Sequence, residues 1–302
     1  MEAMRDVFIN ELCKIAEYDK QIVLLSDDFG APSLDKFREK YNSTQFFSIG
    51  VAEQNLINIA AGLALEGKNV FVYMISSFIS RCYEQIKLNL CAMNLPVTIL
   101  GIGAGFSYDI DGLTHHSLED LSILSVLPNI TILNISTTEM IPEFVKFSYR
   151  NKNGPLYIRM DRKNYSLDYS EENSFCDGFT YLGCNYPSLT IITTGTMVHK
   201  ALEVSNKLKE YWVTADVIDI YRIKPINKDL LLDSVASKKI LVLEENFNTL
   251  GKEISYIFSN KNVNIKYFNI PNFCFENNTR NKLHKSFGID VDTIVKGILA
   301  WT

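Results

Sequence analysis

An acidic residue, Glu53, stands where an apolar stretch gives way to a segment rich in Ala and Gly, in the sequence SIGVAEQNLINIAAGLALEG of residues 48–67. Apolar residues recur there at helical spacing, at Leu56, Ile59, Ala60 and Leu63. The segment therefore predicts a helix that begins at the acid. A carboxylate at this point can stabilise the helix by facing the positive end of its dipole. It can equally be a buried acid with a chemical function, and Glu53 alone leaves both interpretations open.

Three further stretches carry residue types suited to chemistry, and each follows a predicted strand: SDDFGAPS (26–33), SSFISR (76–81) and GIGAGFSYDIDGLTHHSLED (101–120). The last is a long loop, and such loops are more often functional than not. Its adjacent His115 and His116 suit hydrogen bonding or proton transfer better than joint binding of one metal ion. The GIGAGF run has Phe106 where a dinucleotide fingerprint needs its third Gly.

Composition limits the class of protein. The 302 residues are 47% apolar and 22% charged, and the net charge of −5 gives no reason to expect nucleic acid or an anionic membrane as a partner. No apolar run approaches the roughly 20 residues of a membrane span. The first 20 residues form an acidic amphipathic pattern unlike a signal peptide. The cysteines are scattered, without a C-x-x-C pair, so we expect reduced thiols in a cytoplasmic protein.

The order of the predicted elements indicates an α/β fold. In residues 1–165, helices alternate with short apolar strands, which is typical of a parallel sheet covered on both faces. Residues 166–184 are polar and weakly patterned and read as a linker, and residues 185–302 alternate again. We therefore predict two doubly wound domains, 1–165 and 185–302. Sheets of this kind bind ligands at the carboxyl ends of their strands, where the stretches named above lie.

The predicted elements have the following approximate ranges. Helices are expected at 4–18, 34–41, 52–66, 77–93, 138–150, 197–210, 227–236, 250–259 and 290–300. Strands are expected at 21–26, 45–50, 69–75, 96–103, 129–136, 154–160, 188–195, 213–220, 238–246 and 264–270.

Three motifs together resemble a known family. GVAEQNL (50–56), SSFISRCYEQI (76–86) and DGLTHHSLEDL (111–121) occur in the order and spacing of the pyrimidine-binding domain of transketolases and deoxyxylulose-phosphate synthases. The resemblance extends through PNITIL and GPLYIRMDR, and residues 185–302 resemble the C-terminal domain of the same enzymes. It implies a thiamine diphosphate pyrimidine-binding domain followed by a transketolase C-terminal-like domain.

The resemblance assigns roles in cofactor binding. Glu53 aligns with the acid that hydrogen-bonds the N1′ atom of the cofactor's aminopyrimidine, which requires a protonated or proton-sharing carboxyl group in an apolar pocket. Phe78 aligns with an aromatic that stacks on this ring, and Arg81 with an arginine of the deoxyxylulose-phosphate synthase branch. Typical transketolases carry more aromatics here, whereas this chain has Ile75 and Ile79.

Other residues align with substrate contacts. Asp111 and His115 align with residues that contact hydroxyl and carbonyl oxygens of the sugar, and His115 is the expected catalytic partner of Glu53. The residues that align with the family's phosphate contacts are Arg5, Ser33 and Arg162. Arginine suits bidentate phosphate recognition, so the resemblance implies a phosphorylated sugar. A further phosphate-side histidine of the family aligns near Gly103, so substrate shape or phosphate placement differs here.

The family's Mg²⁺ and diphosphate site has no counterpart in this sequence. Full-length members begin with a domain that carries G-D-G followed by Asn, and the DIDG of residues 109–112 does not continue in that way. A cation that holds a diphosphate needs several oxygen ligands, and the chain offers no such set, so no metal ligand is assigned. We therefore expect a separate N-terminal subunit to hold Mg²⁺ and to share thiamine diphosphate with this chain in an α₂β₂ heterotetramer.

The resulting expectation is a transferase, the beta-like subunit of a split transketolase that moves a two-carbon ketol unit between sugar phosphates in carbohydrate metabolism. It would be active only with its partner subunit. Alternatives are the beta subunit of a 2-oxo acid dehydrogenase, an enzyme like deoxyxylulose-phosphate synthase, which Arg81 favours, and a non-catalytic regulatory subunit.

Overall fold

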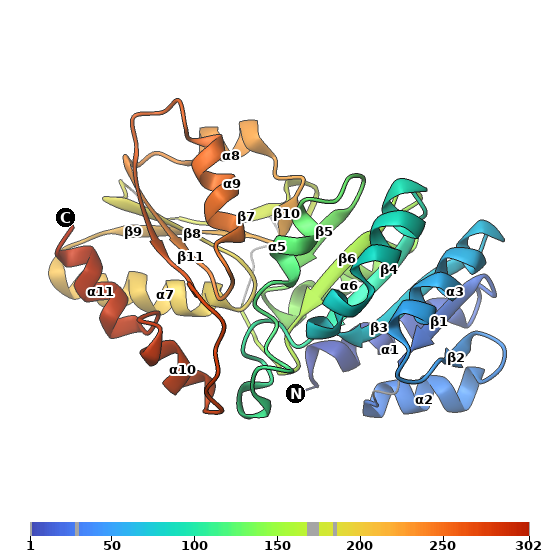
Figure 1. The fold of residues 1–302 in the computed structure, drawn as a ribbon. Coiled ribbons are helices and arrows are strands. Elements are labelled where there is room, and N and C mark those ends of the chain that lie inside the picture. Colours follow the sequence, from blue (N-terminus) through green and yellow to red (C-terminus); the bar gives the residue numbers. More distant parts are fainter. Residues whose placement is uncertain (1, 28–29, 168–174, 184–185, 302) are drawn as a thin grey trace.

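The computed structural model describes residues 2–27, 30–167, 175–183 and 186–301. These residues form a seven-stranded and a five-stranded sheet, and helices cover both faces of each (Figure 1). The blue-to-green elements build most of one unit, and the yellow-to-red elements build the sheet of the other (Figure 1). The predicted fold class, two doubly wound α/β domains, is confirmed.

The first sheet has the order β10-β5-β6-β4-β3-β1-β2. Its strands are β1 (Ile22–Ser26), β2 (Phe46–Ser48), β3 (Asn69–Ile75), β4 (Val97–Ile102), β5 (Thr131–Asn134), β6 (Leu156–Met160) and β10 (Arg222–Lys224). The first six run parallel, and β10 pairs antiparallel with β5. The carboxyl ends of the six parallel strands therefore meet at one edge, which is where the predicted site residues follow.

Side chains of the central strands alternate between two cores because successive residues of a strand point to opposite faces. In β1, Ile22 and Leu24 belong to one core and Val23 and Leu25 to the other. The first core lies under α1 (Met4–Ala16), α2 (Pro32–Tyr41) and α6 (Ile141–Arg150). The second lies under α3 (Glu53–Leu65), the helical segment 76–92 and α5 (Asp120–Ser125). Burial on both faces explains why these strands read as continuous apolar runs.

The second sheet has the order β12-β11-β8-β9-β7. Its strands are β7 (Phe179–Leu182), β8 (Leu189–Thr193), β9 (Ala215–Ile220), β11 (Lys239–Leu243) and β12 (Asn264–Phe268), and only β7 runs antiparallel to its neighbour. One face packs on α7 (Met197–Leu208), α10 (Arg280–Ser286) and α11 (Val291–Leu299). The other packs on α8 (Lys228–Ser234) and α9 (Thr249–Ile257).

The helix expected at 77–93 differs from the prediction. The chain winds as a 3-10 helix over Ser76–Cys82, as α4 over Tyr83–Gln85 and as a π-helix over Ile86–Ala92. Residues three apart eclipse one another in a 3-10 helix, so Phe78 and Arg81 lie above each other, and the half-buried Phe78 also packs against the second core. Other short 3-10 turns are Asp109–Asp111, Thr138–Met140, Phe175–Asp177 and Lys209–Tyr211.

Among the α-helices and strands of the described residues, four have no counterpart among the predicted elements, namely α5, β7, β10 and α10. The predicted linker 166–184 lies partly outside the described residues, and within the described part β7 forms the edge of the second sheet. Strand β10 follows β9 of the second sheet in the chain but forms an edge of the first sheet. The second half of the chain therefore contributes one strand to the first unit. Among the described helices, none has the length and apolar character that crossing a membrane requires.

Candidate active site

Glu53 is the first residue of α3, directly after the loop that leaves β2. Its side chain is only 2% exposed, and one carboxylate oxygen, Oε1, accepts a hydrogen bond from Arg81 Nη1 at 2.9 Å. Arg81 is about half exposed, so it reaches the buried acid from the solvent side. At the start of α3, the Glu53 carboxylate can be stabilised by the positive end of the helix dipole. Because this carboxylate is buried, its charge also needs a partner, which Arg81 provides.

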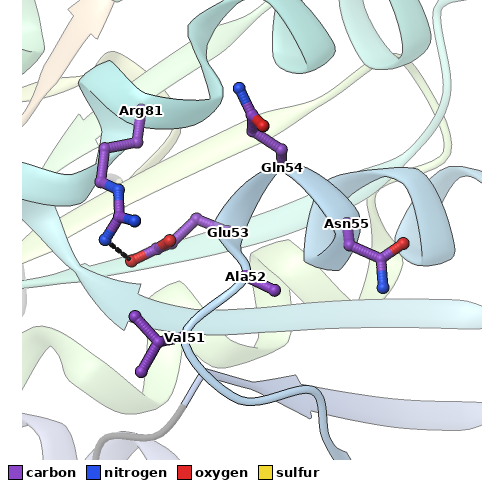
Figure 2. Close-up of a pocket in the computed structure, with 6 residues that line it drawn as sticks. All are labelled: Val51, Ala52, Glu53, Gln54, Asn55 and Arg81. Atoms are coloured by element: carbon purple, nitrogen blue, oxygen red, sulfur yellow. Dashed lines mark hydrogen bonds and ion pairs between the residues drawn. The ribbon is translucent and has the colours of Figure 1, made fainter.

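A cavity of about 570 Å³ opens beside this acid. It is lined by residues 51–55, from the β2–α3 loop and the first turn of α3, together with Arg81. Figure 2 shows the Glu53 carboxyl group between Arg81 and Val51, whose own side chain is 67% exposed. A buried carboxyl group that opens on such a cavity fits the ring nitrogen of a planar heterocycle, since the acid can share a proton with it.

The next contacts run from Arg81 to the loop after β4. The Arg81 guanidinium lies 5.7 Å from the centre of the Phe78 ring. Phe78 meets the imidazole of His115 edge-on, with ring centres 5.8 Å apart. The His115 Nδ1 atom pairs with the Thr114 hydroxyl at 2.9 Å. Arg81 and Phe78, which are predicted to bind the cofactor, therefore form one continuous surface with His115, the predicted catalytic histidine.

Tyr108 extends this surface to the predicted phosphate side chains. Its ring lies 5.7 Å from that of His115, and the Arg162 guanidinium lies 4.7 Å from its centre. Burial raises the pKa of Tyr108 to about 12, although the Arg5 and Arg162 cations and a hydrogen bond from Arg5 oppose the shift. The phenol is therefore neutral at neutral pH. A Cβ at Gly103 would overlap the Tyr108 ring, so this ring fills the space where the family's histidine was expected.

Ser33 joins the same group through an acid that the sequence did not single out. Both the backbone N–H and the hydroxyl of Ser33 donate to Asp6 Oδ1, at 3.2 and 2.6 Å. The other Asp6 oxygen lies 3.8 Å from Arg5 Nε. Asp6 therefore orients two of the three predicted phosphate ligands, Ser33 and Arg5, and offsets part of the Arg5 charge.

The loop between β4 and α5 presents His115 through a turn. The backbone N–H groups of His115 and His116 donate to the Gly112 carbonyl, and Gly112 has φ of 77°, a conformation that favours glycine. Asp111 is exposed within the preceding 3-10 turn, and its N–H donates to the Tyr108 carbonyl at 3.2 Å. His116 is buried, and its Nε2 pairs with the Asp109 carbonyl, which gives it a structural role.

Asp109 closes the far side of the site. Its Oδ1 atom lies 3.9 Å from Arg162 Nη2. The pKa of Asp109 lies below its ordinary value. Burial raises it, but hydrogen bonds from the backbone N–H groups of Arg280 and Ile110, together with the cations of Lys163 and Arg162, lower it by more. Asp109 is thus an anion that holds the Arg162 side chain.

These contacts form a row, here named the site row, which consists of Glu53, Arg81, Phe78, His115, Tyr108, Arg162, Arg5, Asp6 and Ser33. Every predicted site residue belongs to it except Asp111, which is bonded to its Tyr108 member. Tyr108 and Asp6 were missed. The available signals were an aromatic within the Gly-rich loop and an acid next to Arg5. Among the described residues, no three His, Cys, Asp or Glu side chains gather as a metal ion would require.

Comparison with known families matches both halves of the chain. Residues 1–167 match the family model described as transketolase, pyrimidine binding domain, and residues 183–294 match that described as transketolase, C-terminal domain. Family similarity therefore extends over the site row and over both sheets.

Comparison with individual proteins gives one relative of similar length and one that is about twice as long as this chain. The chain is 30% identical to an apulose-4-phosphate transketolase subunit of Phocaeicola vulgatus, over 99% of this chain and 97% of that protein. It is 31% identical to the 1-deoxy-D-xylulose-5-phosphate synthase of Syntrophus aciditrophicus, over 97% of this chain but 46% of that protein. The chain thus spans about half the length of that synthase.

A solved structure described as a split gene transketolase, inactive beta4 tetramer, is also similar. It superimposes with a TM-score of 0.86 at 26% sequence identity, over 99% of this chain and 97% of that one. This chain and the chain of the solved structure therefore have the same fold and the same order of units, and they correspond over almost their whole lengths.

Proposed function

Because this chain belongs to the transketolase family, we propose that it is the C-terminal subunit of a two-subunit, thiamine diphosphate-dependent transketolase. The reaction would be transfer of a two-carbon ketol unit between sugar phosphates. The observation that carries the proposal is the site row, which connects a buried acid, aromatic rings, an imidazole and three arginines at one sheet edge. Such a row can hold a cofactor ring at one end and an anionic sugar at the other.

Glu53 and its cavity would hold the aminopyrimidine part of the cofactor. When bound, thiamine diphosphate supplies the nucleophilic carbon that carries the two-carbon unit. Glu53 would hold or share the proton at the ring's N1′ atom, and its 2% exposure would keep water from competing for that proton. Phe78 is the aromatic beside Arg81, which binds the acid, and it would orient the ring by stacking.

His115 would act on the substrate. A neutral imidazole that accepts the Thr114 hydroxyl proton at Nδ1 carries its own proton at Nε2. That proton suits donation to a carbonyl or hydroxyl oxygen of the sugar, with Asp111 in the same loop as a further hydroxyl contact. Arg162, Arg5 and Ser33 would bind the phosphate, because both guanidinium groups lie next to Tyr108 and carry donors suited to the phosphate oxygens.

A partner chain with the diphosphate-binding domain and Mg²⁺ is part of the proposal. Support comes from the relative named as one subunit of a transketolase, which this chain matches from end to end. An α₂β₂ assembly would place the missing diphosphate contacts over the cavity beside Glu53. Domain boundaries near 165 and 185 are proposed on the same basis, since the two matched families meet there.

The test is reconstitution with an N-terminal subunit that carries the diphosphate-binding domain, in the presence of thiamine diphosphate and Mg²⁺. We expect ketol transfer from the mixture and none from either chain alone. Glu53→Gln should abolish transfer, because the amide cannot release and recover the proton. Glu66→Gln, at the exposed far end of the same helix, should leave transfer unchanged. Circular dichroism and native mass spectrometry establish that both variants fold and assemble.

Two outcomes would contradict parts of the proposal. Transfer by the chain alone would remove the need for a partner. Transfer retained in Glu53→Gln would remove Glu53 from the chemistry.

A second candidate function is favoured by the 31% identity to a 1-deoxy-D-xylulose-5-phosphate synthase and by the Arg81–Glu53 contact. The product of that enzyme lacks the C1 hydroxyl, so its donor must supply an acyl unit instead of a ketol unit. Formation of 1-deoxy-D-xylulose 5-phosphate by the reconstituted protein from a 2-oxo acid, without ketol transfer from a ketose, would select this function.

A further inference from the structure

A buried ion network lies behind the site row, centred on Arg280 at the start of α10. Arg280 is 8% exposed, and its partners Asp161 and Glu245 are 0% and 4% exposed. Asp161 follows β6 of the first sheet, whereas Glu245 follows β11 of the second. The network therefore connects the two units at the carboxyl ends of their strands.

The guanidinium group of Arg280 uses its full set of donors. Nε and Nη2 bind the two oxygens of Glu245, at 2.8 and 2.5 Å, and Nη1 binds Asp161 Oδ2 at 2.5 Å. The remaining hydrogen bonds reach the Tyr165 hydroxyl at 2.8 Å and the Thr196 hydroxyl at 3.1 Å. An arginine carries five N–H donors in a fixed fork, so its orientation and that of Asp161 are fully determined.

From Asp161 the network continues to Arg162. The second Asp161 oxygen, Oδ1, accepts a hydrogen bond from the Ser107 hydroxyl at 2.8 Å. The same hydroxyl oxygen accepts the backbone N–H of Arg162 at 3.0 Å. Ser107 is fully buried and lies next to Tyr108 in the loop after β4. One serine therefore ties the backbone of Arg162 to that loop.

A second path holds the side chain of Arg162. The backbone N–H of Arg280 donates to Asp109 Oδ2 at 3.0 Å, and the other oxygen of Asp109 lies 3.9 Å from Arg162 Nη2. Arg280 therefore acts on both the backbone and the side chain of Arg162 while remaining buried behind it. The residues that line the cavity beside Glu53 do not include Arg280.

We propose that Arg280 is a positioning residue: it fixes Arg162 beside Tyr108 in the geometry that binds an anionic sugar. A buried ion pair adds little net stability compared with apolar packing, whereas its directional bonds do fix geometry. Asp161 and Ser107 transmit the constraint. The inference deepens the proposed function and rests on it, because it concerns the phosphate end of the same site.

The test uses Ser107→Ala in the reconstituted enzyme, since this change removes the connection to Arg162 without stranding a buried charge. The matched control is Ser122→Ala, which removes other hydrogen bonds between the two units, namely the 2.6 Å contact of the Ser122 and Thr249 hydroxyls and the bond from Ser122 Oγ to the Phe247 carbonyl at 3.2 Å. Ser122 lies in α5 and is not a member of the site row. Arg280→Lys is a second variant that keeps the charge and loses the fork.

Acceptors with and without a phosphate are then compared. We expect Ser107→Ala and Arg280→Lys to raise KM for the phosphorylated acceptor about three- to tenfold, with kcat and the KM of the unphosphorylated analogue nearly unchanged. Ser122→Ala should change neither KM. An equal rise in both KM values, or the same selectivity change in Ser122→Ala, would overturn the proposal.

Binding of inorganic phosphate to the assembled protein, measured by calorimetry, separates this proposal from the proposed function. Weaker binding in Ser107→Ala and Arg280→Lys, but not in Ser122→Ala, supports the positioning role even if no ketol transfer is observed. Equal phosphate affinity in all four proteins, or no binding by the wild type, overturns it.

Discussion

Tyr108 is the residue that gives the site row its continuity. Its ring contacts the imidazole of His115 on one side and the guanidinium of Arg162 on another, and it packs on Gly103. Because the phenol stays neutral at neutral pH, it separates the two functional groups without adding charge. A substrate that extends from His115 to Arg162 must therefore pass along an aromatic surface.

Arg162→Met tests the phosphate assignment at the level of a single residue. We expect KM for a phosphorylated acceptor to rise about tenfold or more, because a bidentate charge-assisted contact is lost, with little change for the unphosphorylated analogue. Lys163→Met is the control, since Lys163 is the adjacent exposed cation. Steady-state kinetics with both acceptors provide the measurement. Equal effects of Arg162→Met on the two acceptors would show that Arg162 does not bind the phosphate.

At this scale, the sequence identified residues better than it identified contacts. Glu53, Phe78 and His115 could be chosen because they follow strands within distinctive motifs, and the structure brings them together. Their roles stay predictions. Asp6 had only a weak signal, its position next to Arg5, and Arg280, a base near the end of the chain, had no local signal. Their importance comes from partners that only the folded chain supplies.

Among the elements, α7 and α10 are joined by charged side chains. The Glu245 carboxylate can only accept and the Lys200 ammonium can only donate, so His284 between them is a neutral imidazole with its proton on Nε2. Burial lowers the pKa of His284, in agreement with this state, although Glu245 raises it. Burial likewise lowers the pKa of Lys200 to about 8, with Glu245 opposing the shift.

The lowered pKa of Lys200 predicts that the stability of the protein depends on pH. Its pKa is below the ordinary 10.5 in the folded state, so the unfolded chain binds more protons between pH 8 and 10.5 and folding becomes more favourable as pH rises. The free energy of unfolding of the wild type relative to Lys200→Met should increase by about 3 kcal/mol from pH 7 to pH 10.5. Urea denaturation at several pH values measures this difference. Lys209→Met, an exposed lysine just after α7, controls for loss of a charge.

A pH-independent difference between wild type and Lys200→Met would show that burial does not affect this ammonium group.

Elements with a strong apolar period were predicted from the sequence, and the others were not. The strand at 69–75 and the helix over 52–66 correspond closely to β3 and α3. Strand β10 has three residues and α10 has seven, too few to show a period, and α10 begins with the buried Arg280. The segment 77–93 has a helical apolar pattern, which does not distinguish α from 3-10 or π winding, because tertiary packing decides between them.

At the scale of the whole molecule, the two units share structure instead of merely touching. After β9, the fully buried Tyr221 enters the core of the first unit, where it stacks on Phe175 and meets Phe144. Strand β10 then pairs with β5, and Lys224 donates to the carbonyls of Ser125 and Leu127 at the end of α5. The second half of the chain therefore completes a core in the first half.

This arrangement predicts cooperative unfolding, for which the chain has a convenient probe. Both tryptophans, Trp212 and Trp301, lie in the second half, whereas far-ultraviolet circular dichroism reports on both halves. The two signals should give one coincident thermal transition. Tyr221→Ala should lower the free energy of unfolding by about 3 kcal/mol or more, because it leaves a cavity in the core of the first unit.

Separate transitions in wild type, or a Tyr221→Ala effect confined to the dichroism signal, would mean that the units unfold independently.

The sequence could predict two α/β units but not their connection. Apolar periodicity reports which face of an element is buried, and it is silent about which unit provides the cover. Tyr221 and β10 illustrate this, since they lie within the second half of the chain and contribute to the first sheet and its core.

The Arg280 network also has a consequence for how the chain is made. Arg280 is separated from Asp161 by 119 positions and from Asp109 by 171. The ribosome adds Tyr221 and β10, which complete the core and the sheet of the first unit, before it adds the arginine, and chains fold from the N-terminal side as they emerge. During that interval Asp161 has no guanidinium partner and Arg162 has only its local contacts. The nascent protein thus acquires the framework of its site early and completes the anion-binding geometry among its final steps.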